Sequence, residues 1–457
     1  MGVLLDSWLL ELLVVTGGLF LAIYWYLTST FDYWKLKGVP YLEPTPLLGN
    51  MKDPVLMQRC QHEVLNDIYQ KFEGNRYCGL YQFKQLELMV RNPELVKNAL
   101  VKDFSNFQNR LKNVELTHNR IFENFFVLGA PKWRPLRVMI SPTFTSGKLK
   151  AMFGILVRCA EKLNVSLETS ANKSEVLEMK EVSSNFTTDV IGSCAFRLQV
   201  DSVINPHNKF REFGRKMVSL SLLQMLGSFL LFFIPYFVVM DAIEYRQKNY
   251  IKGNDFLQLI MELKEKGKVS LNAGFETSAS VSTSWPSTRI FNRNSVLEDH
   301  GGELTYDAVQ NMTYLGMVVD ETLRKYPVVG FLTRECTDDY PVLDSNWVLK
   351  RGTSVIIPVY SLHPYPKYFP EPERFDPERF TEQNKKSRPH YCYLPFGEGP
   401  GLYRFGLLQT KVGLASLISK YEFKLSEKSE LPIRFKPSAG VLSSISGIHL
   451  SISHRNK

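Results

Sequence analysis

Two pairs of polar side chains stand at spacings that place each pair on one face of a helix. Trp133 and Arg137 are four residues apart, so both could donate hydrogen bonds to one buried carboxylate. Glu321 and Arg324 are three apart and could form an ion pair along a helix. An amphipathic surface helix produces the same spacings, and exposed pairs contribute little stability. Each pair therefore needs a second motif before it indicates a site.

The cysteines are too scattered in the sequence to suggest a metal centre. There is no Cys-x-x-Cys pair and no cluster of cysteine with histidine among the six positions, Cys60, Cys78, Cys159, Cys194, Cys336 and Cys392. This scatter argues against a zinc site or a disulfide framework. It favours a reducing compartment, where thiols stay unpaired.

The segment 394–406 resembles the haem-binding loop of cytochromes P450. Its first half reads Leu-Pro-Phe-Gly-Glu-Gly-Pro, and the family pattern is Phe-x-x-Gly-x-Arg-x-Cys-x-Gly. In that family the cysteine thiolate is the axial ligand of haem b and favours cleavage of the O–O bond. The resemblance implies that Phe396 lies beside the cofactor. Neither the arginine nor the cysteine of the pattern is present here.

Two positions compete for the place of the missing cysteine. Counting seven residues on from Phe396 reaches Tyr403, and counting back from Arg404 reaches Pro400 after a short deletion. Tyrosinate is a known haem ligand, so Tyr403 is a candidate for binding the metal. The alternative is that Tyr403 is only an aromatic residue beside a haem that is poorly held or absent. Cys392 lies on the wrong side of the Phe-Gly-Glu-Gly turn, so no metal ligand is assigned.

Other motifs resemble the cofactor-binding positions of the same family. The family's Trp-x-x-x-Arg reaches a haem propionate from the third helix, which implies that role for Trp133 and Arg137. Pro135 departs from the pattern and is tolerated only in the first turn of a helix. Arg334, in Thr-Arg-Glu-Cys, matches a further arginine that contacts propionate in the family.

A third motif concerns the core beneath the haem. In the family, Glu-x-x-Arg joins the arginine of Pro-Glu-Arg-Phe in a buried triad. The resemblance therefore implies that Glu321, Arg324 and Arg379 form such a triad here. The order and separation of these two motifs make the resemblance specific, because each motif alone is short.

Ala273–Ser278 resembles the oxygen-activation helix, in which an acid and a hydroxyl relay protons to bound oxygen. The resemblance implies that Glu276 and Thr277 hold these catalytic roles through water. A glycine-containing turn with a surface acid is the alternative. The helix is also short for the family: Ser and Thr crowd the segment after Thr277, and Pro286 interrupts it. We therefore expect distortion at 265–295 and in the cysteine loop.

The N-terminus is apolar in a way that predicts a membrane anchor. No charge occurs from Leu12 to Leu27, the interfacial aromatics Tyr24, Trp25 and Tyr26 lie near the end of this segment, and Lys35 and Lys37 come after it. A cleaved signal peptide would have a basic start and a small-residue cleavage site, which are not evident. The predicted layout is an N-terminal transmembrane anchor (1–30), a proline-rich linker (31–50) and a haem domain (51–457).

The remaining pattern predicts a mainly α protein with small β-sheets, the cytochrome P450 fold. Residues 86–90 read as a strand, and a helix is expected to start at Asn92 because proline follows in its first turn. Residues 355–360 read as a strand at a sheet edge, since Pro358 interrupts it. Apolar residues at helical spacing predict one helix over 306–325.

Composition and resemblance together give two functional hypotheses. The net charge of +9 suits an anionic membrane or an acidic protein, although a solvated basic surface would have the same charge. The resemblance, closest in wording to insect microsomal members, implies a monooxygenase of the endoplasmic reticulum membrane with a cytosolic catalytic domain. It would oxidise apolar small molecules such as xenobiotics, insecticides, hormones or lipids. Electrons would come from NADPH through NADPH-cytochrome P450 reductase, with cytochrome b5 as a second partner, and no nucleic acid would bind.

Because the thiolate is missing, this activity is expected to be impaired or absent. The alternative hypothesis is a non-catalytic member of the family, either a binder of apolar ligands or a pseudogene-like product. A shared fold does not by itself carry the activity, so the residues of the site must decide between the two.

Overall fold

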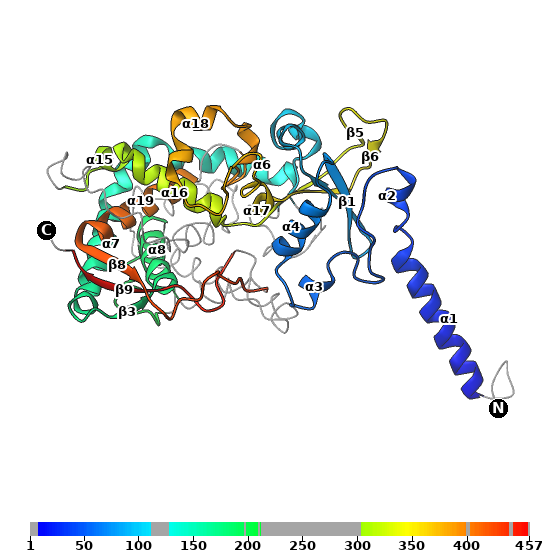
Figure 1. Ribbon diagram of the computed structural model, residues 1–457, viewed down its shortest axis with the longest axis horizontal. Helices are drawn as coiled ribbons and strands as arrows, with labels where there is room; N and C mark the ends of the chain where they lie inside the picture. The colour runs from blue at the N-terminus through cyan, green and yellow to red at the C-terminus, as the bar shows by residue number, and fades with distance from the viewer. Residues whose placement is uncertain are drawn as a thin grey trace, which may run out of the picture. The chain divides into compact units, whose positions relative to one another are not determined.

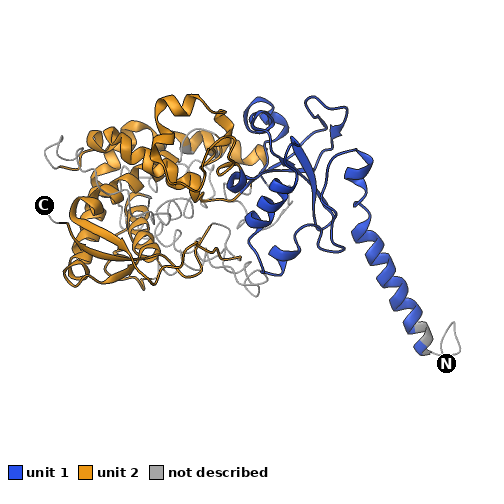
Figure 2. Cartoon of the chain, viewed as in Figure 1, with its two compact units in different colours: residues 1–112, 331–361 blue, residues 113–330, 362–457 orange. Residues whose placement is uncertain are grey.

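Helices make up most of the ordered elements, and the strands form small sheets, as the sequence predicts. The computed structural model describes residues 8–110, 128–195, 198–208, 211, 303–398, 403–437 and 442–455. The chain divides into two compact units, each built from two stretches of sequence (Figure 2): residues 1–112 with 331–361, and residues 113–330 with 362–457. The division into anchor, linker and haem domain remains a prediction.

The first unit is organised around a four-stranded sheet with the order β1-β2-β7-β4. β1 and β2 form an antiparallel hairpin, β2 and β7 are parallel, and β7 pairs antiparallel with β4. Its elements are α1 (Trp8–Thr28), α2 (Tyr33–Leu36), α3 (Lys52–Val55), α4 (Gln61–Lys71), β1 (Tyr77–Gln82), β2 (Gln85–Val90), α5 (Pro93–Lys97), η1 (Asn98–Lys102), η2 (Phe104–Asn106), β4 (Leu332–Glu335), β5 (Tyr340–Pro341), β6 (Val348–Leu349) and β7 (Ser354–Ile357).

Trp34 is the largest fully buried side chain of this unit, and it packs against the hairpin. Its Nε1 donates a hydrogen bond to the carbonyl oxygen of Leu80 at 3.0 Å. Gly79 is required beside it, because a Cβ there would lie 2.4 Å from Cγ of Trp34. The predicted strand at 86–90 corresponds to β2, and Asn92 caps α5 by accepting a hydrogen bond from the backbone N–H of Glu94 at 2.7 Å. Both local predictions are confirmed.

The structure does not support the transmembrane anchor expected over residues 1–30. In the part of the chain that is described, no helix is both long and apolar enough to cross a membrane. α1 (Trp8–Thr28) covers most of the segment and includes Glu11.

The strand predicted at a sheet edge is an interior strand, so that prediction was wrong. β7 pairs with β2 on one side and with β4 on the other. Pro358 does not interrupt this pairing, because the strand ends at Ile357 and the helix α17 (Val359–Leu362) follows. A proline just beyond the last paired residue costs the sheet no hydrogen bond.

The second unit contains the longer helices and a three-stranded sheet of order β3-β9-β8 (Figure 1). Its elements are α6 (Ala130–Ile140), η4 (Ser141–Phe144), α7 (Ser146–Asn172), β3 (Val176–Glu178), α8 (Met179–Ala195), α15 (Tyr306–Asn311), α16 (Thr313–Lys325), η5 (Pro377–Phe380), α18 (Glu382–Lys386), η6 (His390–Cys392), α19 (Tyr403–Lys420), β8 (Tyr421–Leu425) and β9 (His449–His454).

The core of this unit lies where α7, α8 and α19 meet. Leu156, Phe186 and Val412, one from each helix, are fully buried. Gly413 permits the close approach of α19 to α8, because a Cβ there would lie 2.8 Å from Cε1 of Phe186. This packing fixes the position of α19, the helix whose first residues end the segment 394–406 that resembles the haem-binding loop.

Two helices of the second unit differ from the expected pattern. The single helix predicted over 306–325 is divided at Met312, whose ψ of 72° is not helical. Pro135 lies inside α6 beyond the first turn, where the sequence analysis did not expect the helix to tolerate a proline. Proline removes one hydrogen bond of the helical ladder, and α6 nevertheless continues to Ile140.

Candidate functional site

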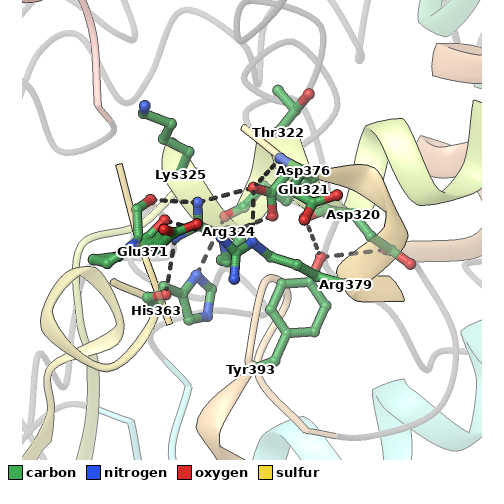
Figure 3. A network of polar contacts seen from close by, with 12 residues as sticks. Asp320, Glu321, Thr322, Arg324, Lys325, His363, Glu371, Asp376, Arg379 and Tyr393 are labelled. Carbon is green, nitrogen blue, oxygen red and sulfur yellow. Dashed lines mark hydrogen bonds and ion pairs between the residues drawn. The ribbon is translucent and has the colours of Figure 1, made fainter. Parts of the chain in front are cut away.

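Glu321 and Arg324 of α16 form a fully buried, bidentate ion pair (Figure 3). Nε of Arg324 lies 2.7 Å from Oε2 of Glu321, and Nη2 lies 2.9 Å from Oε1. Arg379 of η5 approaches the same carboxylate, with its Nε 3.6 Å from Oε1, which is ion-pair distance and too long for a hydrogen bond. The structure thus brings together the three residues of the expected triad.

Two further backbone groups complete the surroundings of Arg324. Its Nη2 donates to the carbonyl oxygen of Pro372 at 2.7 Å, and its Nη1 donates to that of His363 at 3.2 Å. On the other side, Oε1 of Glu321 accepts a hydrogen bond from the backbone N–H of Asp376 at 2.9 Å. Burying an ion pair is costly unless its remaining donors and acceptors are satisfied, and here they are. The triad therefore ties α16 to the segment 363–379.

His363 extends this network towards the segment 394–406, which resembles the haem-binding loop. Sequence reasoning missed this histidine. Its Nε2 accepts a hydrogen bond from the backbone N–H of Leu394 at 2.9 Å, and its Nδ1 lies 3.2 Å from the carbonyl oxygen of Leu323. Complete burial lowers the pKa of His363 to about 3. The ring is therefore neutral at pH 7, with its proton on Nδ1. The only sequence signal was a histidine followed by proline near the Pro-Glu-Arg-Phe motif.

Tyr393 adds a second link to α16 next to the same loop. Its hydroxyl donates to the carbonyl oxygen of Asp320 at 2.8 Å and lies 3.2 Å from the carboxylate Oδ1 of the same residue. Burial is the main cause that raises the pKa of Asp320, and Lys385, 3.5 Å away, opposes that shift. Figure 3 shows Tyr393 and His363 on the same side of the triad. The segment that leads into Phe396 is therefore held rigidly.

Phe396 and Tyr403 are in contact with each other. Their ring centroids lie 5.7 Å apart with the planes at 22°, an arrangement close to stacking. Tyr403 is the first residue of α19, and its side chain is 38% exposed. Pro400, the other candidate position for the ligand, lies outside the described residues.

No cysteine follows Phe396 in the chain, so the ligand position of the loop holds no thiol. All six are free and buried. Burial is the largest cause that raises the pKa of every one of them, in the case of Cys392 to about 11. Sγ of Cys392 also lies 2.8 Å from the carbonyl oxygen of Pro389. Cys392 precedes Phe396 in the sequence, whereas Tyr403 follows it. The donor set therefore does not fit a haem with a thiolate ligand.

The arginine donors, by contrast, fit an acidic group. Arg334 of β4 is buried, and its Nε has no hydrogen-bond partner within the described structure, while Nη1 donates to the carbonyl oxygen of Thr333 at 2.7 Å. Burial lowers the pKa of Arg334 to about 10, and the like charge of Arg110 adds to the effect. Two cations placed together in this way favour a bound anion. Sequence reasoning did not single out Arg110.

The other predicted site residues are only partly placed. Trp133 and Arg137 lie on α6 in the second unit, both partly exposed, and burial lowers the pKa of Arg137. Arg334 belongs to the first unit, so the structure does not place it relative to them. Glu276 and Thr277 lie outside the described residues.

The buried Glu-Arg-Arg triad has the arrangement that the family resemblance implies, and comparison with known proteins agrees with that resemblance. A family model described as cytochrome P450 matches residues 39–282 and 292–452. The chain belongs to the cytochrome P450 family. It is 35% identical to cytochrome P450 6j1 of Blattella germanica, covering 95% of this chain and 96% of that protein. It is also 34% identical to cytochrome P450 6k1 of the same insect, with 97% of each covered.

The comparisons also show an unmatched segment in this chain and residues in the relatives that it lacks. The family match omits residues 283–291, which lie inside the segment expected to be distorted. The alignment with cytochrome P450 6j1 extends over 483 positions, more than the 457 residues of this chain. A similar relation holds for probable cytochrome P450 6a13 of Drosophila melanogaster, 35% identical over 491 positions with 97% of this chain and 98% of that protein covered. The relatives therefore contain segments that this chain lacks.

Proposed function

We propose that this chain is a cytochrome P450 whose oxygenation of apolar small molecules is impaired or absent. The observation that carries the proposal is the loop itself: no cysteine follows Phe396, and the buried thiol of Cys392 is the nearest in sequence. Without thiolate donation the family's cleavage of the O–O bond loses its main support. The family match includes Glu276 and Thr277 and is interrupted just after them, at residues 283–291.

The substrate class and partners follow from the family relationship and complete the proposal. The ancestral substrates would be xenobiotics, insecticides, hormones or lipids, and the electron donors NADPH-cytochrome P450 reductase and cytochrome b5. Association with the endoplasmic reticulum membrane is part of the same proposal. The proposed donors to a haem propionate are Trp133, Arg137 and Arg334, with Arg110 beside the last of these.

The absorption spectrum of the reduced, carbon-monoxide-treated protein tests the proposal. The full chain is produced in insect cells supplied with a haem precursor, and haem content is measured per chain. We expect less than one haem per chain and no red-shifted Soret band of the thiolate type. Such a band in the unaltered chain would overturn the proposal.

A matched variant and a ligand assay sharpen the test. Cys392→Ser removes the nearest thiol, and we expect it to leave the spectrum unchanged. If a thiolate band appeared and was lost in Cys392→Ser, Cys392 would be the ligand. Titration with an apolar fluorescent probe then separates a non-catalytic binder, which saturates, from a chain without a formed pocket, which does not.

A further inference from the structure

Cys60, His62 and Glu63 bring a thiol, an imidazole and a carboxylate together at the start of α4. One potential ligand atom from each lies within 4.8 Å of the others, and no other such group occurs in the described residues. Cys60 and His62 are 3% and 7% exposed, and Glu63 is partly exposed. Sulfur, nitrogen and oxygen donors of these types are the ligands that zinc takes in proteins.

The convergence of these side chains follows from the helix cap. Cys60 is the N-cap residue of α4 and has extended backbone angles (φ −69°, ψ 144°). An N-cap side chain turns back over the first turn, which here contains His62 and Glu63. The backbone N–H of Cys60 also donates to Oε2 of Glu63 at 3.0 Å, which holds the carboxylate close to the cap. Sequence reasoning did not single out this cluster, although the three residues lie within four consecutive positions.

The charges around the cluster favour a cation. Asp53 and Asp67 lie 3.9 Å and 2.7 Å from the guanidinium of Arg59, the residue next to Cys60. The charge of Glu63 also acts on this guanidinium, so three carboxylates influence a single cation. The excess negative charge attracts a divalent ion into a partly desolvated site.

The protonation states and ring contacts are also compatible with binding. Burial lowers the pKa of His62 to about 4, so the imidazole is neutral at pH 7 and able to coordinate. The ring of Tyr360 lies 4.7 Å from that of His62, centroid to centroid, and restricts its orientation. Burial raises the pKa of Cys60 to about 12, so a metal ion must displace the thiol proton.

We propose that Cys60, His62 and Glu63 bind one zinc ion, with water in the fourth position. Zinc bonds of about 2.0–2.3 Å in a tetrahedron place neighbouring ligand atoms roughly 3.5 Å apart, so the cluster must close by about 1 Å. Glu63 is partly exposed and supplies that movement. The proposal does not depend on the function proposed above, because none of the three residues belongs to the candidate haem site.

Calorimetric titration of the purified full chain with zinc chloride tests the site. We expect one ion per chain, with release of about one proton as the thiol ionises. X-ray absorption at the zinc edge should show one sulfur neighbour at about 2.3 Å. This readout detects the thiolate even when haem is present. A zinc environment with no sulfur neighbour would overturn the proposal.

Variants separate specific binding from loss of folding. Cys60→Ser should abolish the sulfur neighbour, and Glu63→Gln, which can still accept the cap hydrogen bond, should weaken zinc binding at least about tenfold. Cys78→Ser is the matched control, an equally buried thiol elsewhere in the first unit, and should bind zinc normally. Unchanged affinity in Glu63→Gln, or a sulfur neighbour that survives Cys60→Ser, would contradict the assignment.

Discussion

The buried imidazole of His363 accepts a hydrogen bond from the backbone N–H of Leu394 at 2.9 Å. The same ring lies against the carbonyl oxygen of Leu323 at the end of α16, one residue before Arg324. One neutral side chain therefore joins the triad helix to the chain two residues ahead of Phe396. The segment entering the loop is held by the protein itself, although the loop has lost its cysteine.

Replacing His363 should change both stability and its pH dependence. In the folded chain the pKa of His363 is about 3, below the ordinary value of about 6.5, so the unfolded state binds the proton more readily. Its contribution is therefore full above about pH 6.5 and declines as the pH falls towards 3. Urea unfolding at several pH values gives the free energy of unfolding as a function of pH. In that range, its slope against pH should be shallower for His363→Phe than for the unaltered chain, by up to about 1.4 kcal/mol per pH unit.

The same variant should also be less stable at pH 7, by about 2 kcal/mol, because the backbone groups of Leu323 and Leu394 lose their partner. His207→Phe is the matched control: its ring is exposed, so the substitution should leave the stability at pH 7 unchanged. An identical pH slope in His363→Phe and the unaltered chain would contradict the burial argument.

Removing Glu321 should strongly destabilise the second unit. Glu321→Ala leaves the buried guanidinium of Arg324 without its anion, and breaking a buried pair in this way costs about 3–5 kcal/mol. The free energy of unfolding of the haem-free protein measures the effect. The control is Glu373→Ala, whose carboxylate is 90% exposed and 3.7 Å from Lys325; it should cost less than about 1 kcal/mol. Equal losses of unfolding free energy in the two variants would show that the triad does not stabilise the second unit.

Replacing Arg334 should have opposite effects on folding and on haem retention. In the haem-free protein Arg334→Met removes a desolvated cation with an unpaired Nε and should raise the free energy of unfolding by about 1 kcal/mol or more. Haem titration of the same variant should show weaker retention. Arg374→Met, at an exposed ion pair, is the control and should be close to neutral. If the haem-free Arg334→Met variant were less stable than the unaltered chain, the role of this arginine would be to stabilise the fold only.

Tyr403 provides a test of ligation that does not depend on activity. Tyr403→Phe keeps the ring on Phe396 and should change stability by less than about 0.5 kcal/mol, whereas Tyr403→Ala loses the ring contact and should cost about 0.5–1.5 kcal/mol. Any haem absorption spectrum should be the same in the unaltered chain and in Tyr403→Phe. A spectral shift in Tyr403→Phe would instead identify tyrosinate as the ligand.

Sequence reasoning succeeded where the determining interactions are local or where a motif is long. Asn92 and the proline after it specify a helix start by cap geometry, and the structure contains that start. It failed where pairing partners come from distant segments. The proline at 358 suggested an edge strand, but β7 gains neighbours on both sides from residues far away in the chain. The membrane span expected near the N-terminus is not supported, because no helix in the described part of the chain is long and apolar enough to cross a membrane.

The sequence alone determined the family, because Glu321, Arg324 and Arg379 occur in motifs whose order and separation are specific, and it also determined that the loop contains no thiol. Only the tertiary structure decided what surrounds those residues. The role of His363 and the like-charged pair of Arg110 and Arg334 both depend on burial. Burial sets protonation and leaves donors without water, and it is created by segments that are distant in sequence.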